Sequence, residues 1–163
     1  ITVSAAGLNV NQIGAVEALL QAAEFDVTVS ADIRYDIWYK LWGNMTMNPL
    51  SALTGATCDL ILDDPEAKAF ASSVMDEASR IGAAIGCSIE QSAEDRHEIT
   101  RKLGAFKTSM LQDAESGKNL EIGALLEAPQ EIARLAGIDT PSLDHLLGVM
   151  RVFNKSLTAR SSQ

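Results

Sequence analysis

The sequence is poor in the residues that build metal centres, disulfide frameworks and nucleic-acid-binding surfaces. Its 163 residues include two cysteines and two histidines, and neither histidine stands in a metal-ligand spacing. The 13 lysine and arginine residues are outnumbered by 22 aspartate and glutamate residues, which gives a net charge of −9. An acidic chain is a poor partner for nucleic acid or for an anionic membrane surface, because both need clustered cations.

Long apolar runs are also missing. No run reaches the roughly 18 residues of a transmembrane helix, and the start of the sequence does not resemble a signal peptide. Two cysteines, Cys58 and Cys87, make neither a disulfide framework nor a metal site, which fits a reducing compartment, and we expect a metal-free protein of the cytoplasm. The sequence begins with Ile1 rather than Met, so we expect a fragment, a processed product or a trimmed chain.

What is present predicts a mostly α-helical bundle. Apolar residues make up 47% of the chain and charged residues 21%, which is typical of a globular protein with a core. Several helix starts and one interruption are signalled by capping residues and prolines. They are Asp64 before Pro65, Ser109 with Gln112 as a capping box, Pro129 inside a helix with an expected kink, and Thr140 before Pro141. Gly86 is expected to end the helix that begins at Pro65, and residues 92–104 are expected to form an exposed polar helix.

The first 30 residues differ from the rest. Two short β-leaning segments, "ITVSAAG" and "FDVTVS", flank a helical segment, as in the end of an α/β unit. We therefore predict two parts. Residues 1–30 are a short β-containing remnant of an α/β domain, and residues 31–163 are a helical domain.

The stretch "WYKLWGNMTMNPLSAL", residues 38–53, combines a buried character with a polar stripe. At 100° per residue, Lys40, Asn44 and Asn48 fall within about 80° of one another on a helix, and the two tryptophans lie opposite. The three polar residues span about 12 Å of helix axis at 1.5 Å per residue. One interpretation is the solvated face of an amphipathic helix. The other is the wall of a polar cleft, because Asn is a poor helix former whose amide suits hydroxyl and carbonyl groups of a ligand. Pro49 adds an expected kink and a freed carbonyl at Met45.

The same residues resemble a known family. The pattern W-x-K-L-x-x-N-x-x-x-N-P-L-S-A-L is similar to the start of the helical C-terminal domain of ketopantoate reductase (2-dehydropantoate 2-reductase). Three downstream segments resemble the same domain in the same order: "DEASRIGAAIGC", "TSMLQDAESGKNLEI" and "AGIDTPSLDHLLGVM". The resemblance covers roughly residues 20–157.

The resemblance implies a reaction and a set of residues. The family reduces 2-ketopantoate with hydride from NADPH, giving pantoate for pantothenate and coenzyme A synthesis. Lys40 would be the general acid, Asn44 and Asn48 would bind the hydroxyl and polar groups of the substrate, and Ser109 would bind its carboxylate. Glu121 would lie near Lys40 and contact the cofactor or a substrate hydroxyl. The residues alone give simpler explanations for two of these: a helix cap for Ser109, and for Glu121 an acid that complements a helix dipole.

Departures from the family pattern limit what the chain could do by itself. The Gly-rich G-x-G-x-x-G motif of the cofactor-binding domain is absent, so the NADPH site would lie mainly on an absent N-terminal dinucleotide-binding domain. Cys58 lies where the family has a further Asn, and Gly123 and Glu127 also depart from it. Because of these departures, the sequence does not identify which 2-keto acid is the substrate.

Three hypotheses follow. In the first, the chain is the C-terminal substrate domain of an NADPH-dependent reductase, inactive without its nucleotide-binding domain and expected to form a homodimer. In the second, it is a helical dimerisation or interaction module without catalysis. In the third, it is the helical half of a different 2-keto or hydroxyacid dehydrogenase.

Overall fold

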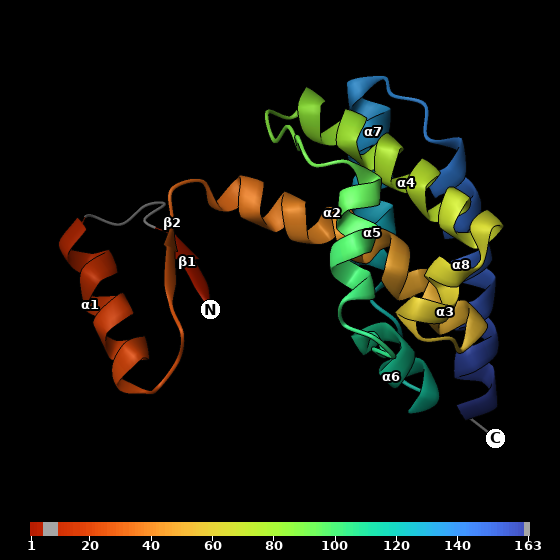
Figure 1. Ribbon diagram of the computed structural model, residues 1–163, viewed down its shortest axis with the longest axis horizontal. Coiled ribbons are helices and arrows are strands. Elements are labelled where there is room, and N and C mark those ends of the chain that lie inside the picture. The colour runs from red at the N-terminus through yellow and green to blue at the C-terminus, as the bar shows by residue number, and fades with distance from the viewer. Residues whose placement is uncertain (5–9, 162–163) are drawn as a thin grey trace. The chain divides into compact units, whose positions relative to one another are not determined.

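The computed structural model describes residues 1–4 and 10–161 and divides into two compact units (Figure 1). The first unit is Ile1–Tyr39 and the second is Lys40–Gln163, so this division by contacts falls inside a helix. The domain boundary predicted after residue 30 stays a prediction. The two units are described in turn.

The first unit contains a small parallel β-α-β motif. Strands β1 (Thr2–Ser4) and β2 (Thr28–Ser30) pair in parallel, with Thr2 opposite Thr28 and Ser4 opposite Ser30. Parallel strands need a crossover connection, and helix α1 (Val10–Ala22) supplies it. The prediction of two short β segments that flank a helix, as in an α/β unit, is therefore confirmed. Two strands cannot bury much apolar surface, and Leu19 and Phe25 remain 72% and 50% exposed.

The second unit is made of helices, as predicted. Helix α2 (Ile33–Thr54) begins in the first unit and continues into the second. The elements that follow are α3 (Cys58–Asp63), α4 (Pro65–Ala84), α5 (Ala93–Arg101), α6 (Ser109–Glu115), the π-helical turn η1 (Gly123–Glu127), α7 (Ala128–Ala136) and α8 (Pro141–Ser161). Helix α4 contacts α3, α5, α7 and α8 and so organises the bundle.

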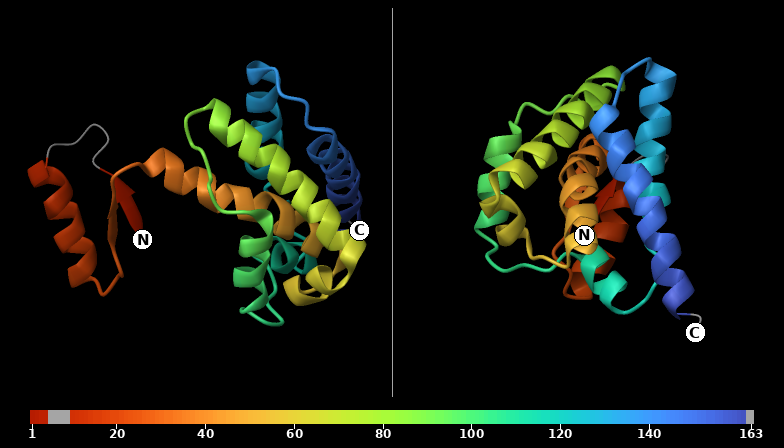
Figure 2. Two further views of the ribbon diagram at one scale, coloured as in Figure 1. Left: turned by 45° about the horizontal axis from the view of Figure 1, so that its top comes forward. Right: turned by 90° about the vertical axis from the view of Figure 1, so that its right-hand side faces the viewer.

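The second half of α2 runs through the middle of this bundle, with α4 and α5 to one side and α8 to the other (Figure 2). Its apolar side is buried as the sequence predicted: Trp42 is 1% exposed and Met45 is fully buried. The indole nitrogen of Trp42 donates a hydrogen bond of 2.9 Å to the carbonyl of Met75 on α4. This bond satisfies the polar atom of a buried aromatic side chain and fixes α2 against α4.

Both predicted ends of α4 are confirmed. The carboxylate of Asp64 accepts hydrogen bonds from the backbone N–H groups of Glu66 and Ala67, which would otherwise be unpaired at the helix start. At the other end Gly86 has a φ of +79°, a left-handed conformation that favours glycine. The N–H of Cys87 closes the helix by donating to the carbonyl of Gly82 at 2.8 Å.

The predicted cap of α6 is wrong by one residue. The N-cap is Thr108, whose hydroxyl accepts a hydrogen bond of 3.1 Å from the N–H of Leu111. Ser109 is instead the first residue of the helix, and the side chain of Gln112 donates to the carbonyl of Lys107. The physical reason is that Thr108 has the extended backbone of a cap, with φ −66° and ψ 158°.

The start of α8 is also capped differently from the prediction. Helix α8 begins at Pro141 as expected, but the hydroxyl of Thr140 donates to the carboxylate of Asp144. The free N–H groups of Ser142 and Leu143 donate to the two carboxylate oxygens of Glu77, each at 2.9 Å. Glu77 is only 4% exposed, so a buried carboxylate from α4 caps a helix 65 residues away.

The two interior prolines have different consequences. Helix α2 continues through Pro49 to Thr54. Pro129, by contrast, follows the wide turn η1, in which the N–H of Ala128 donates to the carbonyl of Gly123. A proline ring clashes with the carbonyl four residues before it, and a widened turn relieves that clash. The irregularity predicted at Pro129 thus takes the form of a π-helical turn.

Candidate substrate site

The polar stripe on α2 borders a small cavity. Asn44 is half-buried and Asn48 is 8% exposed, so the C-terminal part of the stripe is not a solvated face. Both asparagines line a cavity of about 80 Å³. The other lining residues are Gly43 and Met47 from α2, Cys58 from α3, Arg96 and Thr100 from α5, and Leu103, Phe106 and Thr108 from the segment that follows. For the two asparagines, the structure therefore favours the cleft interpretation.

Lys40 lies on the same face of α2, one turn before the cavity wall. Residues three and four positions apart are neighbours on a helix surface, so Lys40 adjoins Gly43 and Asn44. Its side chain is exposed, and no hydrogen bond or ion pair joins its ammonium group to any described residue. The ammonium group is thus accessible to a ligand.

Ser109 and Glu121 lie outside the residues that line the cavity. Ser109 is exposed at the first position of α6, next to the cavity-lining Thr108. Glu121 is exposed just before η1, where its carbonyl accepts the N–H of Leu125. The structure brings Lys40, Asn44 and Asn48 together on one helix face. The roles predicted for Ser109 and Glu121 stay predictions.

The sequence interpretation missed the contribution of α5. Arg96 and Thr100, one turn apart on that helix, both face the cavity. A methyl group built at Gly43 would lie 2.9 Å from both the Nε and one Nη of Arg96, so the guanidinium group is packed against the backbone of α2. A glycine inside a helix is costly, and Gly43 between Trp42 and Asn44 was the signal that another group approaches there.

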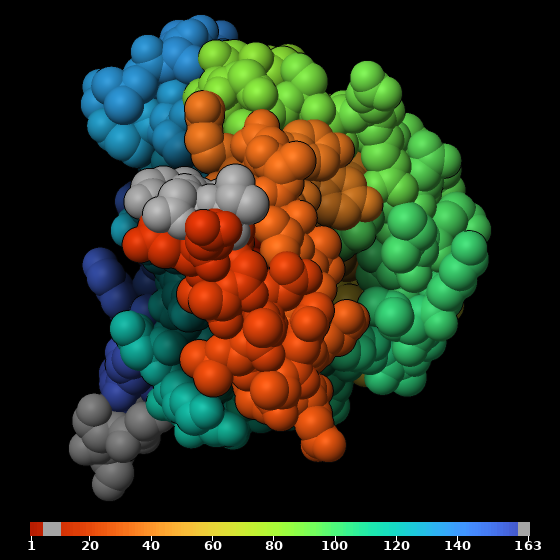
Figure 3. Space-filling view, turned by 90° about the vertical axis from the view of Figure 1, so that its left-hand side faces the viewer, coloured from red at the N-terminus to blue at the C-terminus, as the bar shows by residue number. Residues whose placement is uncertain are grey.

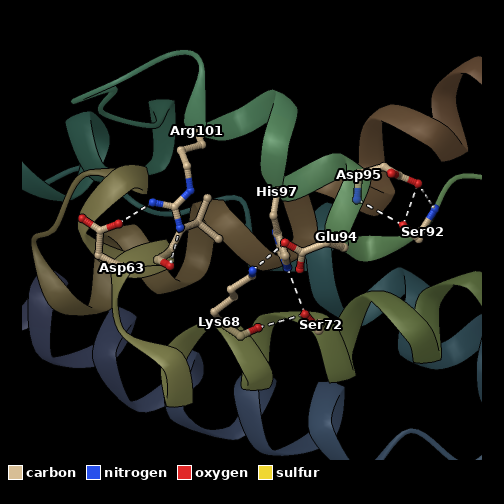
Figure 4. Close-up of polar contacts among 9 residues, drawn as sticks. Asp63, Lys68, Ser72, Ser92, Glu94, Asp95, His97 and Arg101 are labelled. Atoms are coloured by element: carbon tan, nitrogen blue, oxygen red, sulfur yellow. Dashed lines mark hydrogen bonds and ion pairs between the residues drawn. The ribbon is translucent and has the colours of Figure 1, made fainter.

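Helix α5 is tied to α4 by a buried histidine and an ion pair (Figure 4). The ring Nε2 of His97 lies 3.0 Å from the hydroxyl of Ser72, and Lys68 pairs with Glu94 at 2.7 Å. His97 is 2% exposed, which corrects the prediction that this helix is simply exposed. Burial lowers the pKa of His97, with Glu94 opposing the shift and Lys68 and Arg101 adding to it.

Further contacts fix both ends of α5. Ser92 and Asp95 form a capping box at its start, with the N–H of Asp95 donating to the Ser92 hydroxyl at 3.1 Å. At its end Arg101 donates to the carbonyl of Leu62 at 2.7 Å and pairs with Asp63, which joins α5 to α3. Arg96 is therefore presented to the cavity by a helix held on both sides.

Cys58 is one of the residues that line the cavity. It is 2% exposed and packs in an apolar cluster with Met47, Ile61 and Leu62. Its N–H donates to the carbonyl of Phe106 at 3.1 Å, which holds the two lining residues together. Burial, followed by the nearby charge of Asp59, raises the pKa of the Cys58 thiol. A buried thiol thus stands where the resemblance led us to expect an amide.

The described residues do not fit a nicotinamide dinucleotide on their own. A cavity of about 80 Å³ is far too small for it. A larger hollow of about 460 Å³ is lined by three acidic residues, Glu131, Asp139 and Asp144, and by one cation, Arg134, which already pairs with Glu131. A wall with an excess of acidic groups repels phosphate groups. In the described part of the chain no group of three or more metal-ligating side chains is present, and no described helix is long and apolar enough to cross a membrane.

Comparison with known proteins first defines a class. The structure superposes on 2-dehydropantoate 2-reductase from Methylococcus capsulatus with a TM-score of 0.84 and 26% identity, covering 93% of this chain and 48% of that one. It also superposes on D-mandelate dehydrogenase with NADH at a TM-score of 0.79, where 20% identity shows a shared fold alone. The helical fold is thus one found in reductases and dehydrogenases.

The family follows from the sequence. Residues 32–154 match the family model described as "Ketopantoate reductase PanE/ApbA C terminal", and the chain belongs to this family. It is 43% identical over 136 residues to 2-dehydropantoate 2-reductase from Mesorhizobium japonicum, covering 83% of this chain and 40% of the relative. A protein from Ralstonia solanacearum provisionally assigned as a ketopantoate reductase is 52% identical, with a TM-score of 0.85, over 89% of this chain and 44% of that one. The chain therefore spans less than half the length of these relatives.

Proposed function

We propose that this chain is the substrate-binding and catalytic helical domain of an NADPH-dependent 2-keto acid reductase of the 2-dehydropantoate 2-reductase type. The observation that carries the proposal is the single face of α2 that bears Lys40, Asn44 and Asn48, of which the two asparagines line the cavity and Lys40 stands one turn before it. Family membership and the names of its relatives support the reaction class.

Lys40 is proposed as the proton donor to the ketone oxygen. Reduction of a ketone places negative charge on that oxygen, and an ammonium group aimed at it stabilises the charge and supplies the proton. Lys40 fits this role because its exposed side chain has no partner among the described residues and stands one turn from the cavity. The amides of Asn44 and Asn48 can donate to and accept from a substrate hydroxyl.

Ser109 and Glu121 are proposed as additional ligand contacts. Ser109 begins α6 beside the cavity-lining Thr108, where a rotation of its exposed hydroxyl could reach an anion. Glu121 is exposed before η1 and is available to a ligand or to the nucleotide. Neither residue carries the proposal.

The nucleotide is proposed to sit mainly on a dinucleotide-binding domain that acts together with this chain. When bound there, NADPH supplies the hydride. Support comes from the poor fit of a dinucleotide to the cavities of the described residues, and from the exposed Leu19 and Phe25 beside a two-stranded parallel sheet. Parallel sheets are normally covered on both faces, so a larger α/β neighbour suits this motif. A homodimer and a place in pantothenate synthesis in the cytoplasm belong to the same proposal. A dimeric ketopantoate reductase from Staphylococcus aureus, 25% identical with a TM-score of 0.76, is among the similar structures.

The test is a reductase assay on two proteins. The chain alone should not oxidise NADPH with 2-ketopantoate, whereas the chain fused behind the N-terminal part of the Mesorhizobium relative should. Lys40→Ala in the fusion should lower kcat by about 10²- to 10⁴-fold, the usual contribution of a positioned acid. Full activity of Lys40→Ala would overturn the assignment of Lys40.

A second candidate is reduction of another 2-keto acid, which the fold shared with D-mandelate dehydrogenase and the apolar surroundings of Cys58 favour. A substrate panel that includes phenylglyoxylate and 2-ketopantoate separates the two candidates. If the fusion binds NADPH but reduces no member of the panel, the reductase proposal is wrong and the result favours the hypothesis of an interaction module without catalysis.

A further inference from the structure

The cavity beside α2 has one charged wall residue. Of its ten lining residues, Arg96 alone carries a formal charge, and no acidic side chain is among them. The chain as a whole has a net charge of −9, so an anion approaching it is repelled unless a cation is placed locally. A cavity with a single half-buried guanidinium group is the place in this surface that suits an anion.

Residues of two helices, α5 and α2, determine where the Arg96 side chain lies. On α5 it stands one turn before Thr100, whose hydroxyl donates to the Arg96 carbonyl at 3.0 Å. On α2 only a glycine leaves room for it, since a methyl group at Gly43 would meet its Nε at 2.9 Å. Helix α5 forms part of the surface facing the viewer, in green at the right of Figure 3. Arg96 itself is half-buried rather than enclosed.

We infer that Arg96 binds the carboxylate of the substrate. The ligand class is a small 2-keto acid anion, with its carboxylate in the cavity between α2 and α5 and its ketone directed along α2 toward Lys40. This inference rests on the proposed function and adds to it the residue that recognises the substrate charge.

The spacing along α2 agrees with this orientation. Lys40 precedes Gly43 by three residues, or about 4.5 Å of helix rise. In a 2-keto acid the ketone carbon is bonded directly to the carboxylate carbon, so the proposed orientation places the two groups one bond apart between the cavity and the turn of α2 that carries Lys40. The guanidinium fork matches a carboxylate with two parallel hydrogen bonds, which a lysine cannot reproduce.

The size and lining of the cavity restrict the ligand. Its volume of about 80 Å³ exceeds the roughly 30 Å³ that one water molecule occupies, so it admits a carboxylate with a short substituent. Asn44 and Asn48 offer hydrogen bonds on one side, while Leu103 and Phe106 offer apolar contact on the other. A 2-keto acid with a small branched or hydroxylated chain could hydrogen-bond to the asparagines and make apolar contacts with the opposite side.

The test measures binding to the chain itself. Sodium 2-ketopantoate and its uncharged amide are titrated into the wild-type chain, followed by calorimetry and by NMR of the arginine Nε–H signals. We expect the acid to bind and to move the Arg96 signal, and the amide to bind at least about 10-fold more weakly, the scale of a charge-assisted hydrogen bond. Arg96→Gln should weaken binding of the acid by a similar factor, and Arg96→Lys by less. Arg80→Gln, at an exposed position on α4, is the matched control and should leave binding unchanged.

Gly43→Ala separates recognition from folding. The new methyl group should displace the guanidinium of Arg96 while the helix gains a better helix former, so thermal stability should hold or rise as affinity for the acid falls. The inference is overturned if the wild-type chain does not bind the acid, or if Arg96→Gln and Gly43→Ala bind it as tightly as wild type. The latter result leaves the reductase proposal standing. The opposite result is also distinguishable. If the chain binds the acid through Arg96 but the fusion reduces no 2-keto acid, the proposed function is wrong and the assignment of Arg96 remains.

Discussion

Removal of the Glu77 carboxylate should cost a large part of the stability of the helical unit. This side chain is 4% exposed on α4 and accepts two hydrogen bonds of 2.9 Å from the N–H groups of Ser142 and Leu143 at the start of α8. A negative charge at a helix N-terminus also complements the helix dipole. Glu77 therefore joins two long helices that are separated in sequence by four other elements.

The magnitude follows from the bonds that are lost. Each hydrogen bond to a charged acceptor is worth about 1.5–3 kcal/mol. Glu77→Ala loses both and leaves two poorly hydrated N–H groups, so we expect a loss of about 3–5 kcal/mol in the free energy of unfolding. Glu77→Gln keeps one acceptor oxygen but turns an NH₂ group toward the second N–H, so its loss should be about half as large.

Urea unfolding followed by helical circular dichroism measures the loss. The midpoint should fall with little change in slope, and the melting temperature should drop by about 6–20 °C at 2–4 °C per kcal/mol for a chain of this size. Asp76→Ala, next to Glu77 but exposed, is the matched control and should change stability by less than about 0.5 kcal/mol. If Glu77→Ala costs no more than Asp76→Ala, the cap between α4 and α8 contributes nothing and the reasoning is refuted.

Three further perturbations test local features. The pKa of His97 is lowered by burial, so the unfolded state binds a proton first and the free energy of unfolding should fall as pH drops below about 6.5, the usual histidine pKa. His97→Gln should flatten this slope above about pH 5, where carboxylates remain ionised, and replacement of the exposed His145 should leave it intact. Asp64→Ala should cost about 1 kcal/mol in urea unfolding through loss of the α4 cap. Gly86→Ala should also destabilise the fold, because alanine is strained at a φ of +79°.

Features that depend on neighbouring residues could be predicted from the sequence. The start of α4 at Asp64 and its end at Gly86 follow from capping residues and a left-handed glycine within a few positions of each other. The burial of Trp42 and the stripe that contains Asn44 and Asn48 follow from the 3.6-residue period. The resemblance to the family was carried by the same stripe, and the match over residues 32–154 confirms it.

Features that depend on distant residues could not be predicted in this way. No local signal links Glu77 to Ser142, because a cap supplied from another helix depends on how two helices pack. Thr108 and Ser109 are both acceptable caps by type, and the choice between them was settled by the backbone angles of the preceding loop. The same limit applied to α5, whose polar sequence hid the buried His97 and the contribution of Arg96 to the cavity.

The weak helix formers of α2 are concentrated where the cavity lies, and this conflict is itself informative. Within six residues the helix carries Gly43, Asn44 and Asn48, at a cost of about 1 kcal/mol for the glycine and up to about 0.7 kcal/mol for each asparagine relative to alanine. The opposite side holds Trp42 and Met45 at 0–1% exposure, so packing there offsets the cost. A helix that needed only to be stable would carry better formers on its other side as well. Their absence along one face, next to the exposed ammonium of Lys40, supports the proposal that this face binds a ligand, because departures from local preference are expected at functional or strained sites.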